Sequence, residues 1–389
     1  MTKDNQLQKG TILALRHLKK TFYKFMMHGL TYKYNSIIMP KNRLLAQCDM
    51  VKIDLNEFTK IKDLNIDEHF NKIYKFINDN FLDQETYRIK IPIDLLKWFL
   101  YDCKIKALVD KSEDILSLVA YRTDCLQIEC DINEHVNIKL VCTDKLYRHR
   151  RFAKRLLAIL EKDCINNNSM SGFYMSNIGF MKPFCQLKYY YRPINPEILI
   201  LSGFSGFKEA DLKNKNNNII DYYKLQEELS LDLKVIKKDD MDTIYELYNE
   251  NRDRYNFSHV YTQDDLTKIL CSDAITAYCV WKNNEIIDFF GYYKIYHESI
   301  VNKKRRDIVV GNVFMYTTVN TTVYNLFKNI LTLMASHNID LLSILNNQDS
   351  DSIIEPLQFM DSESFNYIYL FNWYVLEFKP NQIGSITHF

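Results

Sequence analysis

Residues 136–164 read VNIKLVCTDKLYRHRRFAKRLLAILEKDC, and three patterns in this stretch decide the fold. Residues 136–143 have the apolar composition of a buried strand. From residue 152 onward an apolar side chain recurs at every fourth position, which predicts a helix with one face packed on a sheet. These side chains are Phe152, Leu156, Leu160 and Cys164. The stretch therefore predicts a strand, a basic turn (DKLYRHRR) and a helix in direct succession.

The basic turn has the composition of an anion site. A helix N-terminus offers unpaired N–H groups and the positive end of the macrodipole, so a phosphate is stabilised there. Arg148, Arg150 and Arg151 stand in or just before the first helical turn, where cations oppose the dipole unless an anion lies among them. From these residues alone, a solvated basic loop and a nucleic-acid contact remain as alternatives.

The composition of the whole chain limits what that anion can be. With 389 residues the chain is long enough for two domains, and we predict a boundary near residue 205. A formal charge of +1 gives no general attraction to nucleic acid or to anionic lipid, so a polyanion site must be local. Hydrophobic residues make up 47% of the chain, which excludes a disordered protein.

The nine cysteines form an odd set without a CxxC pair, which argues against a zinc cage or a disulfide framework. We expect reduced cysteines, no metal and a cytoplasmic protein. The N-terminal segment has no signal-peptide core, and no apolar run approaches the ~18 residues that a membrane span needs.

The first half of the chain begins with helical patterns and then changes to the period of strands. Amphipathic helices are expected at residues 12–26, 66–80 and 93–101. Four strand-like runs follow, separated by short polar breaks, and they predict an antiparallel meander. The runs are 105–109, 115–123, 125–131 and 136–143. Two further β-rich runs cover 172–181 and 186–192.

The second half repeats this order of elements, which indicates an internal pseudo-repeat. Helices, three strands, a helix and further strands follow one another from about residue 239 to residue 378. The segment between the third strand and the helix reads TTVNTTVY (317–324) and holds no cation. If both halves share a fold, only the first half can hold a polyphosphate.

A meander whose last strand leads into a phosphate-binding turn and a helix is the arrangement of acetyltransferase-like folds that bind coenzyme A. Three segments make the comparison more specific: RHRRFA at 148–153, KPFCQLKYYYRPINPEIL at 182–199, and LQF followed by YLFNW within 357–373. In these segments the sequence resembles the N-myristoyltransferases, and the resemblance covers about residues 20–389. It implies an α+β (α/β) N-myristoyltransferase fold of two acetyltransferase-like (GNAT) halves related by a pseudo-twofold. Residues 1–205 would bind acyl-CoA, and residues 206–389 would bind the peptide and end in a buried C-terminus.

The resemblance also implies a reaction, the transfer of myristoyl from myristoyl-CoA to the α-amine of an N-terminal glycine. The backbone amides of Leu140 and Val141 would form the oxyanion hole, and the terminal carboxylate of Phe389 would be the base. The residues that correspond to the cofactor site are Tyr23, Lys24, Phe25, Met26, Cys142, Arg148, His149, Arg150, Arg151, Phe152 and Ala153.

On the peptide side, the resemblance implies contacts from Phe81, Asp83, Glu85, Tyr87, Met175, Tyr189, Tyr191, Phe204, Ser343 and Glu363. The expected partners are proteins with an N-terminal glycine, without nucleic acid, bound by a monomer. Lys139 and Met175 stand where the family has an Asn and a Thr that help to bind the glycine amine, and a family G-D-G loop reads Ser362-Glu363-Ser364. Two alternatives therefore stay open: a catalytically weak or inactive protein that binds acyl-CoA, and an acyltransferase of the same fold with another chain length or acceptor.

Overall fold

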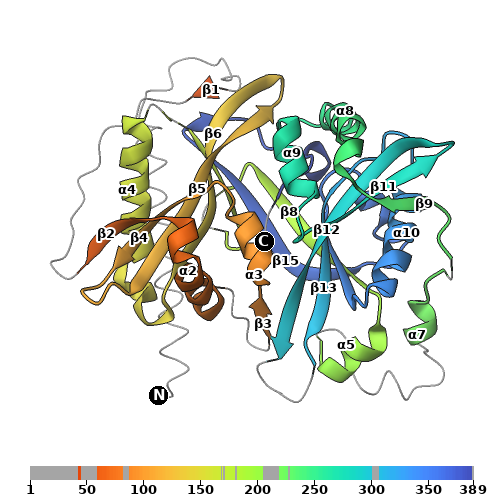
Figure 1. Ribbon diagram of the computed structural model, residues 1–389, viewed down its shortest axis with the longest axis horizontal. Coiled ribbons are helices and arrows are strands. Elements are labelled where there is room, and N and C mark those ends of the chain that lie inside the picture. Colours follow the sequence, from red (N-terminus) through yellow and green to blue (C-terminus); the bar gives the residue numbers. More distant parts are fainter. Residues whose placement is uncertain are drawn as a thin grey trace. The chain divides into compact units, whose positions relative to one another are not determined.

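The structure is a computed structural model (Figure 1), which describes nine stretches of the chain. These are residues 43–44, 59–81, 87–167, 169, 171–179, 182–204, 219–226, 228–299 and 306–387. The chain divides into two compact units. Unit 1 comprises Met1–Phe81, Leu100–Gln186 and Asn366–Phe378, and unit 2 comprises Leu82–Phe99, Leu187–Phe365 and Lys379–Phe389. The boundary near residue 205 stays a prediction.

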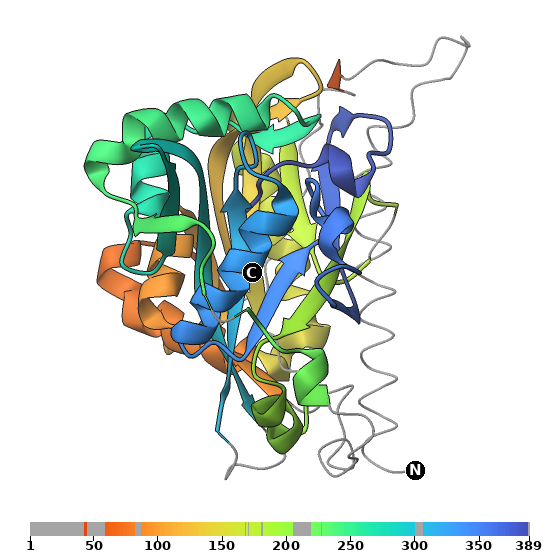
Figure 2. The same ribbon diagram turned by 90° about the vertical axis from the view of Figure 1, so that its right-hand side faces the viewer.

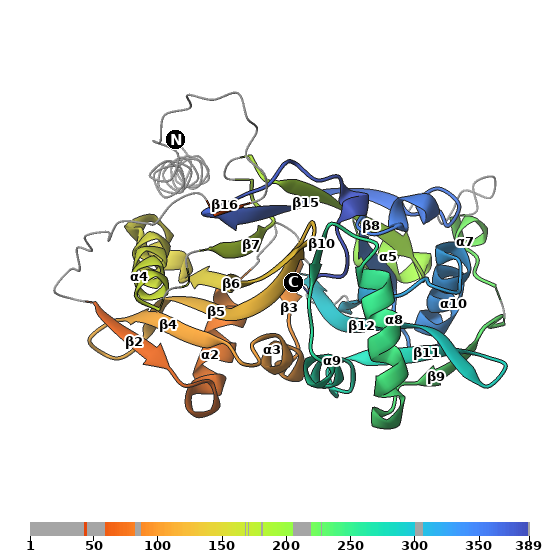
Figure 3. The same ribbon diagram turned by 90° about the horizontal axis from the view of Figure 1, so that it is seen from above.

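Unit 1 is built on a sheet of six strands in the order β2, β4, β5, β6, β7, β15. Neighbouring strands are antiparallel except for β6 and β7, which are parallel and are connected through η1 and the helix α4. Figure 3 shows α4 and α2 on opposite faces of this sheet. The bounds are β2 Lys60–Leu64, α2 Ile66–Asn80, β4 Lys104–Val109, β5 Ile115–Ile128, β6 Asp131–Thr143, η1 Lys145–Arg150, α4 Phe152–Asn166, β7 Gly172–Ser176 and β15 Met360–Phe371, with β1 Arg43–Leu44 paired to β16 Trp373–Tyr374.

The helix predicted from residue 152 packs on this sheet as expected. Phe152, Leu156 and Leu160 are buried in one cluster with Ile138 of β6, and Cys164 packs against it. Apolar residues at spacings of four share one helix face, so the stripe lies on the sheet along its full length. The helices predicted at 66–80 and 93–101 are also confirmed, by α2 and by α3 (Ile93–Phe99).

The meander differs from the prediction in one respect. The runs 115–123 and 125–131 are not separate strands, because β5 continues without interruption from Ile115 to Ile128. The polar residues taken as a break are satisfied inside the sheet: Asp124 is 8% exposed and forms an ion pair with Arg122 at 2.6 Å. Its other oxygen accepts a hydrogen bond from Asn137 Nδ2 at 2.6 Å. A paired buried charge therefore takes the place of a turn.

The strands of unit 2 follow the order β9, β11, β12, β13, β14, β8, with β3 paired to the far end of β12. Here β13 and β14 are the parallel pair, and α10 connects them. The strands are β3 Tyr87–Lys90, β8 Cys185–Pro193, β9 Asp232–Val235, β10 Phe257–His259, β11 Thr276–Lys282, β12 Glu285–Ser299, β13 Ile308–Tyr316 and β14 Leu341–Leu345. The helices are α3, α5 Pro196–Ser202, α7 Ile219–Tyr222, α8 Met241–Arg252, α9 Gln263–Leu270 and α10 Val323–Ser336, with short 3-10 turns η2 Lys238–Asp240, η3 Ser350–Ile353 and η4 Pro380–Gln382.

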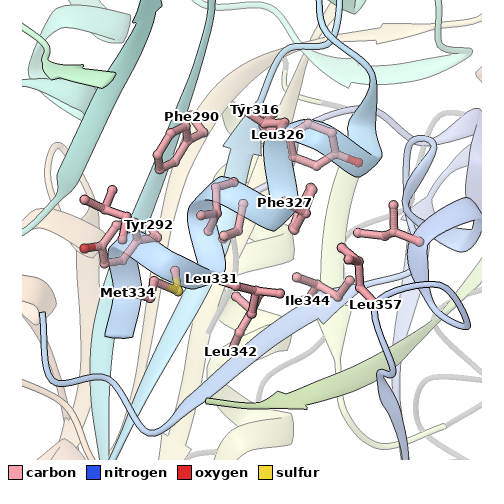
Figure 4. Close-up of a cluster of buried hydrophobic side chains, with 14 of the residues drawn as sticks. Phe290, Tyr292, Tyr316, Leu326, Phe327, Leu331, Met334, Leu342, Ile344 and Leu357 are labelled. Atoms are coloured by element: carbon pink, nitrogen blue, oxygen red, sulfur yellow. The ribbon is translucent and has the colours of Figure 1, made fainter. Parts of the chain in front are cut away.

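The helix α10, blue in Figure 2, forms the centre of the apolar core of unit 2. Its buried face packs against alternate residues of the strands, as Figure 4 shows for Phe290 and Tyr292 of β12 and Leu342 and Ile344 of β14. Gly291, between those two aromatic residues, faces the other way, toward Leu270 of α9. The sheet is therefore covered by helices on both faces. None of the described helices is both long and apolar enough to cross a membrane.

The two units repeat one plan, which confirms the pseudo-repeat and the mixed α/β fold. In each, two long antiparallel strands lead into a helix and then into a strand parallel to the second of them. Each of these long strands also carries one β-bulge, and the bulges of β5 and β6 lie at the same relative positions as those of β12 and β13. Lys139 is the extra residue of β6 and Phe314 that of β13, while Leu116 and Ile287 are the extra residues of β5 and β12. The bulges therefore fix which residues of the two units are equivalent.

Candidate functional site

The basic turn has an unusual backbone conformation. Asp144 begins it, and its side chain accepts a hydrogen bond from Leu146 N at 2.8 Å. After η1, Arg151 adopts φ 61°, a left-handed conformation that a bulky residue seldom takes, and α4 starts at the next residue. Within the described part of the chain, no side chain caps the N-terminus of α4. The first amides of this helix are therefore available to an anion.

The arginines of the turn are presented to solvent. Arg148, Arg150 and Arg151 are all exposed, whereas Phe152 is buried and anchors the start of α4. Asn80, the last residue of α2, holds the turn from the side: its Oδ1 accepts Lys145 N at 3.0 Å, and its carbonyl accepts the Arg148 guanidinium. Sequence reasoning missed Asn80, because a polar residue at a helix end gives no hint of a partner 65 residues later.

Beyond the bulge, β6 separates from β7. The β6–β7 ladder covers only Val136–Ile138, whereas Leu140 and Val141 still pair with β5. The last residue pair that joins β6 to β7 is Ile138 with Tyr174. Leu140 and Val141 lie beyond it, on the edge of β6 that faces away from β5. Backbone groups at such an opening are free to bond a ligand, which is what an oxyanion hole requires.

Cys142, which directly follows Val141, is not a nucleophile in this environment. Its side chain is 3% exposed, and burial raises the pKa of its thiol to about 12. The thiolate is the reactive form of cysteine, so this thiol stays protonated at neutral pH. Ala153 lies half-buried in the first turn of α4.

The bulge residue Lys139 lies in a polar cluster on unit 1. Burial lowers the pKa of its ammonium to about 8, the charge of Arg122 lowers it further, and Asp124 and Cys103 oppose this shift. Met175 lies half-buried on β7 opposite Ile368 of β15. Phe81 follows α2 and caps its C-terminus through an N–H bond of 2.7 Å to the carbonyl of Ile77.

In unit 2, the structure brings together three residues predicted on the peptide side. The rings of Tyr87 and Tyr191 lie 6.3 Å and 5.8 Å from the ring of Phe204. The Tyr87 hydroxyl donates to the carbonyl of Ser202 at 2.6 Å, and burial raises the pKa of Tyr191 to about 12. These residues come from β3, β8 and the end of α5. They form an aromatic cluster.

A row of polar residues crosses the sheet beside this cluster. In the strand registers Tyr191 lies opposite Ser343, and Ser343 opposite Asn312. Asn312 is 7% exposed, and its Nδ2 has no acceptor among the described residues. His297 lies 6.3 Å from Tyr87, and burial lowers the pKa of its imidazole to about 4. Sequence reasoning missed Asn312 and His297, although each is a polar residue in an apolar strand run, which is a usable signal.

Tyr189 and Glu363 belong to a second, more exposed group. The Ser362 hydroxyl donates to the carbonyl of Tyr189 at 2.7 Å. Glu363 is exposed with φ 55°, so a non-glycine residue adopts the left-handed conformation in this segment. Its N–H bonds Asp361, which forms an ion pair with Lys188.

The C-terminal segment is buried in unit 2 as far as Thr387, which is 8% exposed. Ile383 bridges to Phe257, Gly384 N donates to the carbonyl of Phe257 at 2.7 Å, and the Gly384 carbonyl accepts Asn347 Nδ2 at 2.7 Å. Several predicted residues lie outside the described part of the chain, and so does the side chain of His149. They are Tyr23, Lys24, Phe25, Met26, Asp83, Glu85 and Phe389.

Among the described residues, no group of three or more His, Cys, Asp or Glu is arranged to hold a metal ion. The N-terminal domain model of myristoyl-CoA:protein N-myristoyltransferase matches residues 45–186, and the C-terminal domain model matches residues 203–385.

Curated relatives and solved structures agree with these matches. Glycylpeptide N-tetradecanoyltransferase of Plasmodium falciparum (isolate 3D7) is 24% identical over 336 residues, which cover 83% of this chain and 81% of the relative. A probable glycylpeptide N-tetradecanoyltransferase of Caenorhabditis elegans is 24% identical over 339 residues, covering 83% and 74%. The crystal structure of Saccharomyces cerevisiae N-myristoyltransferase with bound myristoyl-CoA superimposes with a TM-score of 0.81 at 16% identity, covering 91% of this chain and 96% of the other. The chain therefore belongs to the myristoyl-CoA:protein N-myristoyltransferase family and is an acyltransferase of this kind.

Proposed function

We propose that this protein transfers a myristoyl group from myristoyl-CoA to the α-amine of an N-terminal glycine in proteins and peptides. The observation that carries the proposal is the opening of β6 beyond Lys139, directly followed by the arginine turn and the uncapped start of α4. A site for a carbonyl oxygen and a site for phosphates thus lie on one continuous segment. The names of the relatives and the myristoyl-CoA bound in the yeast structure support this choice of substrates.

The turn would bind coenzyme A through its phosphates. Charge-assisted hydrogen bonds from arginine to phosphate are among the stronger polar contacts, and a helix N-terminus adds amide donors. Arg148, Arg150 and Arg151 are exposed and close to that terminus. Phe152 fixes the start of α4 by packing into the apolar cluster between this helix and the sheet. The remaining predicted cofactor contacts, Tyr23 to Met26, would cover the ligand.

The chemistry would be a direct attack without an acyl-enzyme. The glycine nitrogen attacks the thioester carbon, the carbonyl oxygen becomes an oxyanion held by the amides of Leu140 and Val141, and the C–S bond then breaks. The protonated Cys142 is consistent with the absence of a covalent intermediate on this segment.

The attacking amine must first lose a proton, and the terminal carboxylate of Phe389 is the base that the resemblance implies. A carboxylate of pKa ~3.5 is about four units below a glycine ammonium of ~7.7–8.0, so the transfer is roughly 6 kcal/mol uphill in water. Burial reduces this gap by raising the pKa of the carboxylate or lowering that of the amine. The burial of the chain up to Thr387 supports such a placement.

The peptide would lie against the aromatic cluster and the polar row of unit 2. Tyr87, Tyr191 and Phe204 offer apolar area, and Ser343 and Asn312 offer hydrogen bonds in a buried setting. Glu363 would favour lysine or arginine a few residues after the glycine, together with Asp83 and Glu85. This preference should fade with salt, since exposed charges are screened over about 8–10 Å.

The experiment is mass spectrometry of a glycine-initiated peptide after incubation with the protein and myristoyl-CoA. We expect a mass increase of one myristoyl group on that peptide, and none on a matched peptide that starts with alanine or with N-acetylglycine. Palmitoyl-CoA and acetyl-CoA in parallel test the chain length. Acylation of a lysine side chain in the N-acetylated control would contradict the proposal.

A second candidate is a catalytically weak protein that still binds acyl-CoA. It is favoured by Lys139 and Met175, which replace the polar residues expected to handle the amine. In the same experiment it predicts tight myristoyl-CoA binding without a modified peptide.

A further inference from the structure

The C-terminal segment of unit 2 is tied to two other segments of the same unit. One is β10, where the Phe257 carbonyl accepts Gly384 N at 2.7 Å and Phe257 forms a parallel bridge with Ile383. The other is the turn that follows β14. There, Gln348 N donates to the Ile383 carbonyl at 2.9 Å. The neighbouring Asn347 donates from Nδ2 to the Gly384 carbonyl at 2.7 Å. These bonds all meet at residues 383–384.

The turn that supplies these donors is itself buried and braced. Gln348 is 1% exposed and adopts φ 54°, a left-handed conformation that a non-glycine residue keeps only where the surrounding structure enforces it. The Ser350 hydroxyl lies 2.9 Å from the Leu345 carbonyl and 2.7 Å from the Asn347 carbonyl, which closes the turn. The side-chain amide of Gln348 adds a longer bond of 3.4 Å to the Ser385 hydroxyl. The donors are therefore held in place before they bond the C-terminal segment.

The same turn is continuous with the strands of the proposed peptide site. It follows β14, which carries Ser343 of the polar row four residues before Asn347. Asn346, between the strand and the donors, accepts Lys188 N at its Oδ1 at 2.7 Å and donates its own N–H to the Lys188 carbonyl at 3.0 Å. Lys188 directly precedes Tyr189 on β8. The C-terminal segment is thus attached to the two paired strands against which the peptide would lie.

The contact at Gly384 also opposes a shift of the segment along its own direction. A Cβ at this position would lie 2.0 Å from Ser258 Oγ and 3.2 Å from the Tyr255 ring, so the backbone passes directly against these side chains. A shift by one residue would bring Ile383 or Ser385, which both have a Cβ, to this place. Phe389 follows Gly384 by five residues, and a chain spans at most about 3.3–3.6 Å per residue. The place of Gly384 therefore limits where a carboxylate on Phe389 can lie.

We propose that Asn347 and Gln348 are positioning residues for the terminal carboxylate of Phe389, the base of the reaction. The inference rests on the proposed function. A base must lie within about 2.6–3.2 Å of the proton donor, here the glycine ammonium. The donors of Asn347 and Gln348 fix the register of the segment that carries the carboxylate, and a misplacement of about 1 Å can cost about 100-fold in rate. Both residues act through this segment and need no contact with the substrate.

The test removes one donor at a time. Asn347→Leu keeps the approximate size of the side chain and loses the bond to the Gly384 carbonyl. Gln348→Val makes the left-handed conformation unfavourable, whereas Gln348→Gly adopts it freely and keeps the N–H that bonds Ile383. The control is Asn320→Leu, which removes a bond of the same kind, from Nδ2 to the Ile287 carbonyl at 2.8 Å, at an exposed place in unit 2.

Turnover of a glycine peptide is followed from pH 6.5 to pH 9.5. Asn347→Leu and Gln348→Val should each lose about 100-fold in kcat at pH 7. Most of this loss should be recovered at pH 9.5, because the glycine amine, with a reference pKa of ~7.7–8.0, is then already neutral and needs no base. Gln348→Gly should restore most of the turnover that Gln348→Val loses. Asn320→Leu should keep the wild-type profile, and myristoyl-CoA affinity and the peptide KM should stay close to wild type in every variant.

Two results would overturn the positioning role. The first is full turnover of Asn347→Leu at pH 7. The second is a loss of equal size at every pH, because a merely structural defect does not depend on the protonation of the glycine amine. If Asn347→Leu does not fold, Asn347→Ser, whose side chain is too short to reach Gly384, replaces it. Failure of the proposed function is distinguishable, since the wild-type protein would then bind myristoyl-CoA and modify no peptide before any variant is compared.

Discussion

Two equivalent strands lead into a helix, β6 into α4 in unit 1 and β13 into α10 in unit 2. The segments that connect strand and helix differ in length and composition. Aligned on their bulges, unit 1 uses residues 142–151 and unit 2 uses residues 317–322, so the connection in unit 1 is four residues longer. The extra length carries the arginines. Ser117 of β5 and Asp288 of β12 occupy the same place beneath the two connections.

Asp288 acts as a built-in anion for unit 2. It is fully buried, and its carboxylate accepts Val319 N at 2.7 Å, Asn320 N at 3.0 Å and the Thr317 hydroxyl at 3.0 Å. Burial raises the pKa of this carboxyl group, while those three bonds lower it. Ser117 in unit 1 is neutral, and among the described residues its hydroxyl bonds to β6, donating to the Cys142 carbonyl at 3.1 Å and sharing a hydrogen bond of 2.8 Å with the Thr143 hydroxyl. Unit 2 therefore fills its turn with a side chain, whereas in unit 1 we propose that a ligand takes that place.

The sharpest way to break this comparison is to give unit 1 the carboxylate of unit 2. Ser117→Asp should abolish measurable myristoyl-CoA binding, because a buried negative charge beneath the turn competes for its donors and repels the phosphates. Ser117→Asn, of the same size but neutral, should bind within a few-fold of wild type. Isothermal titration at matched Tm measures both. Equal affinities for the two variants would show that charge at this position does not select the ligand.

Removing the cations of the turn should have the next largest effect. Arg148→Ala with Arg150→Ala is expected to weaken coenzyme A binding by about 100-fold, since each charge-assisted contact contributes about 1.5–3 kcal/mol and both arginines are partly screened by solvent. Thr321→Ala in the equivalent turn of unit 2 serves as the control and should leave the affinity unchanged. A double variant that binds coenzyme A with full strength would reduce the turn to a solvated loop.

In unit 2, loss of the internal anion should affect stability and leave myristoyl-CoA affinity unchanged. Asp288→Ala leaves the N–H groups of the half-buried Val319 and the exposed Asn320, and the buried Thr317 hydroxyl, without their acceptor, so we expect a loss of about 3 kcal/mol. Thermal unfolding measures the change against Asp239→Ala, an exposed aspartate of η2. A stability equal to that of the control would mean that water satisfies these donors, and the comparison would lose its physical basis.

The elements of this fold could be predicted from the sequence because periodicity reports burial. The helix from Phe152 and its apolar stripe follow directly from spacing, and so does α2. The continuity of β5 across two predicted strands could not be predicted. Asp124 looks like a turn residue until its partners Arg122 and Asn137 are placed beside it.

The site shows the same limit more strongly. Tyr87, Tyr191 and Phe204 meet although they come from separate segments, and only the resemblance indicated them together. The equivalence of Ser117 and Asp288 depends on strand register, which no local pattern contains. Register is set by which side chains pack on each face, so it emerges only from the assembled sheet.

The two bulge residues provide the last and smallest test. Phe314 is 4% exposed and packs against Trp98 at 5.4 Å and Tyr293 at 5.9 Å, so the bulge of unit 2 contributes to the core. Lys139 at the same place has a pKa lowered to about 8, so its burial costs stability whenever it is charged. Below pH 8 both the folded and the unfolded lysine are protonated, and the cost is fully present. Between pH 8 and about 10.4 the folded state has released its proton while the unfolded chain still holds it, so wild-type stability rises with pH relative to a variant without the group.

Lys139→Met should therefore be more stable than the wild type by about 1–2 kcal/mol at pH 7, and this advantage should shrink steadily toward pH 10. Urea unfolding at pH 7, 8.5 and 10 measures the difference, with Lys104→Met as the control that shows no pH-dependent change. If the stability advantage of Lys139→Met were the same at all three pH values, it would come from packing of the methionine alone. Burial would then not disfavour the charged form of Lys139. A shrinking advantage would mean that unit 1 retains at its bulge a residue that costs stability, where unit 2 has one that adds to it.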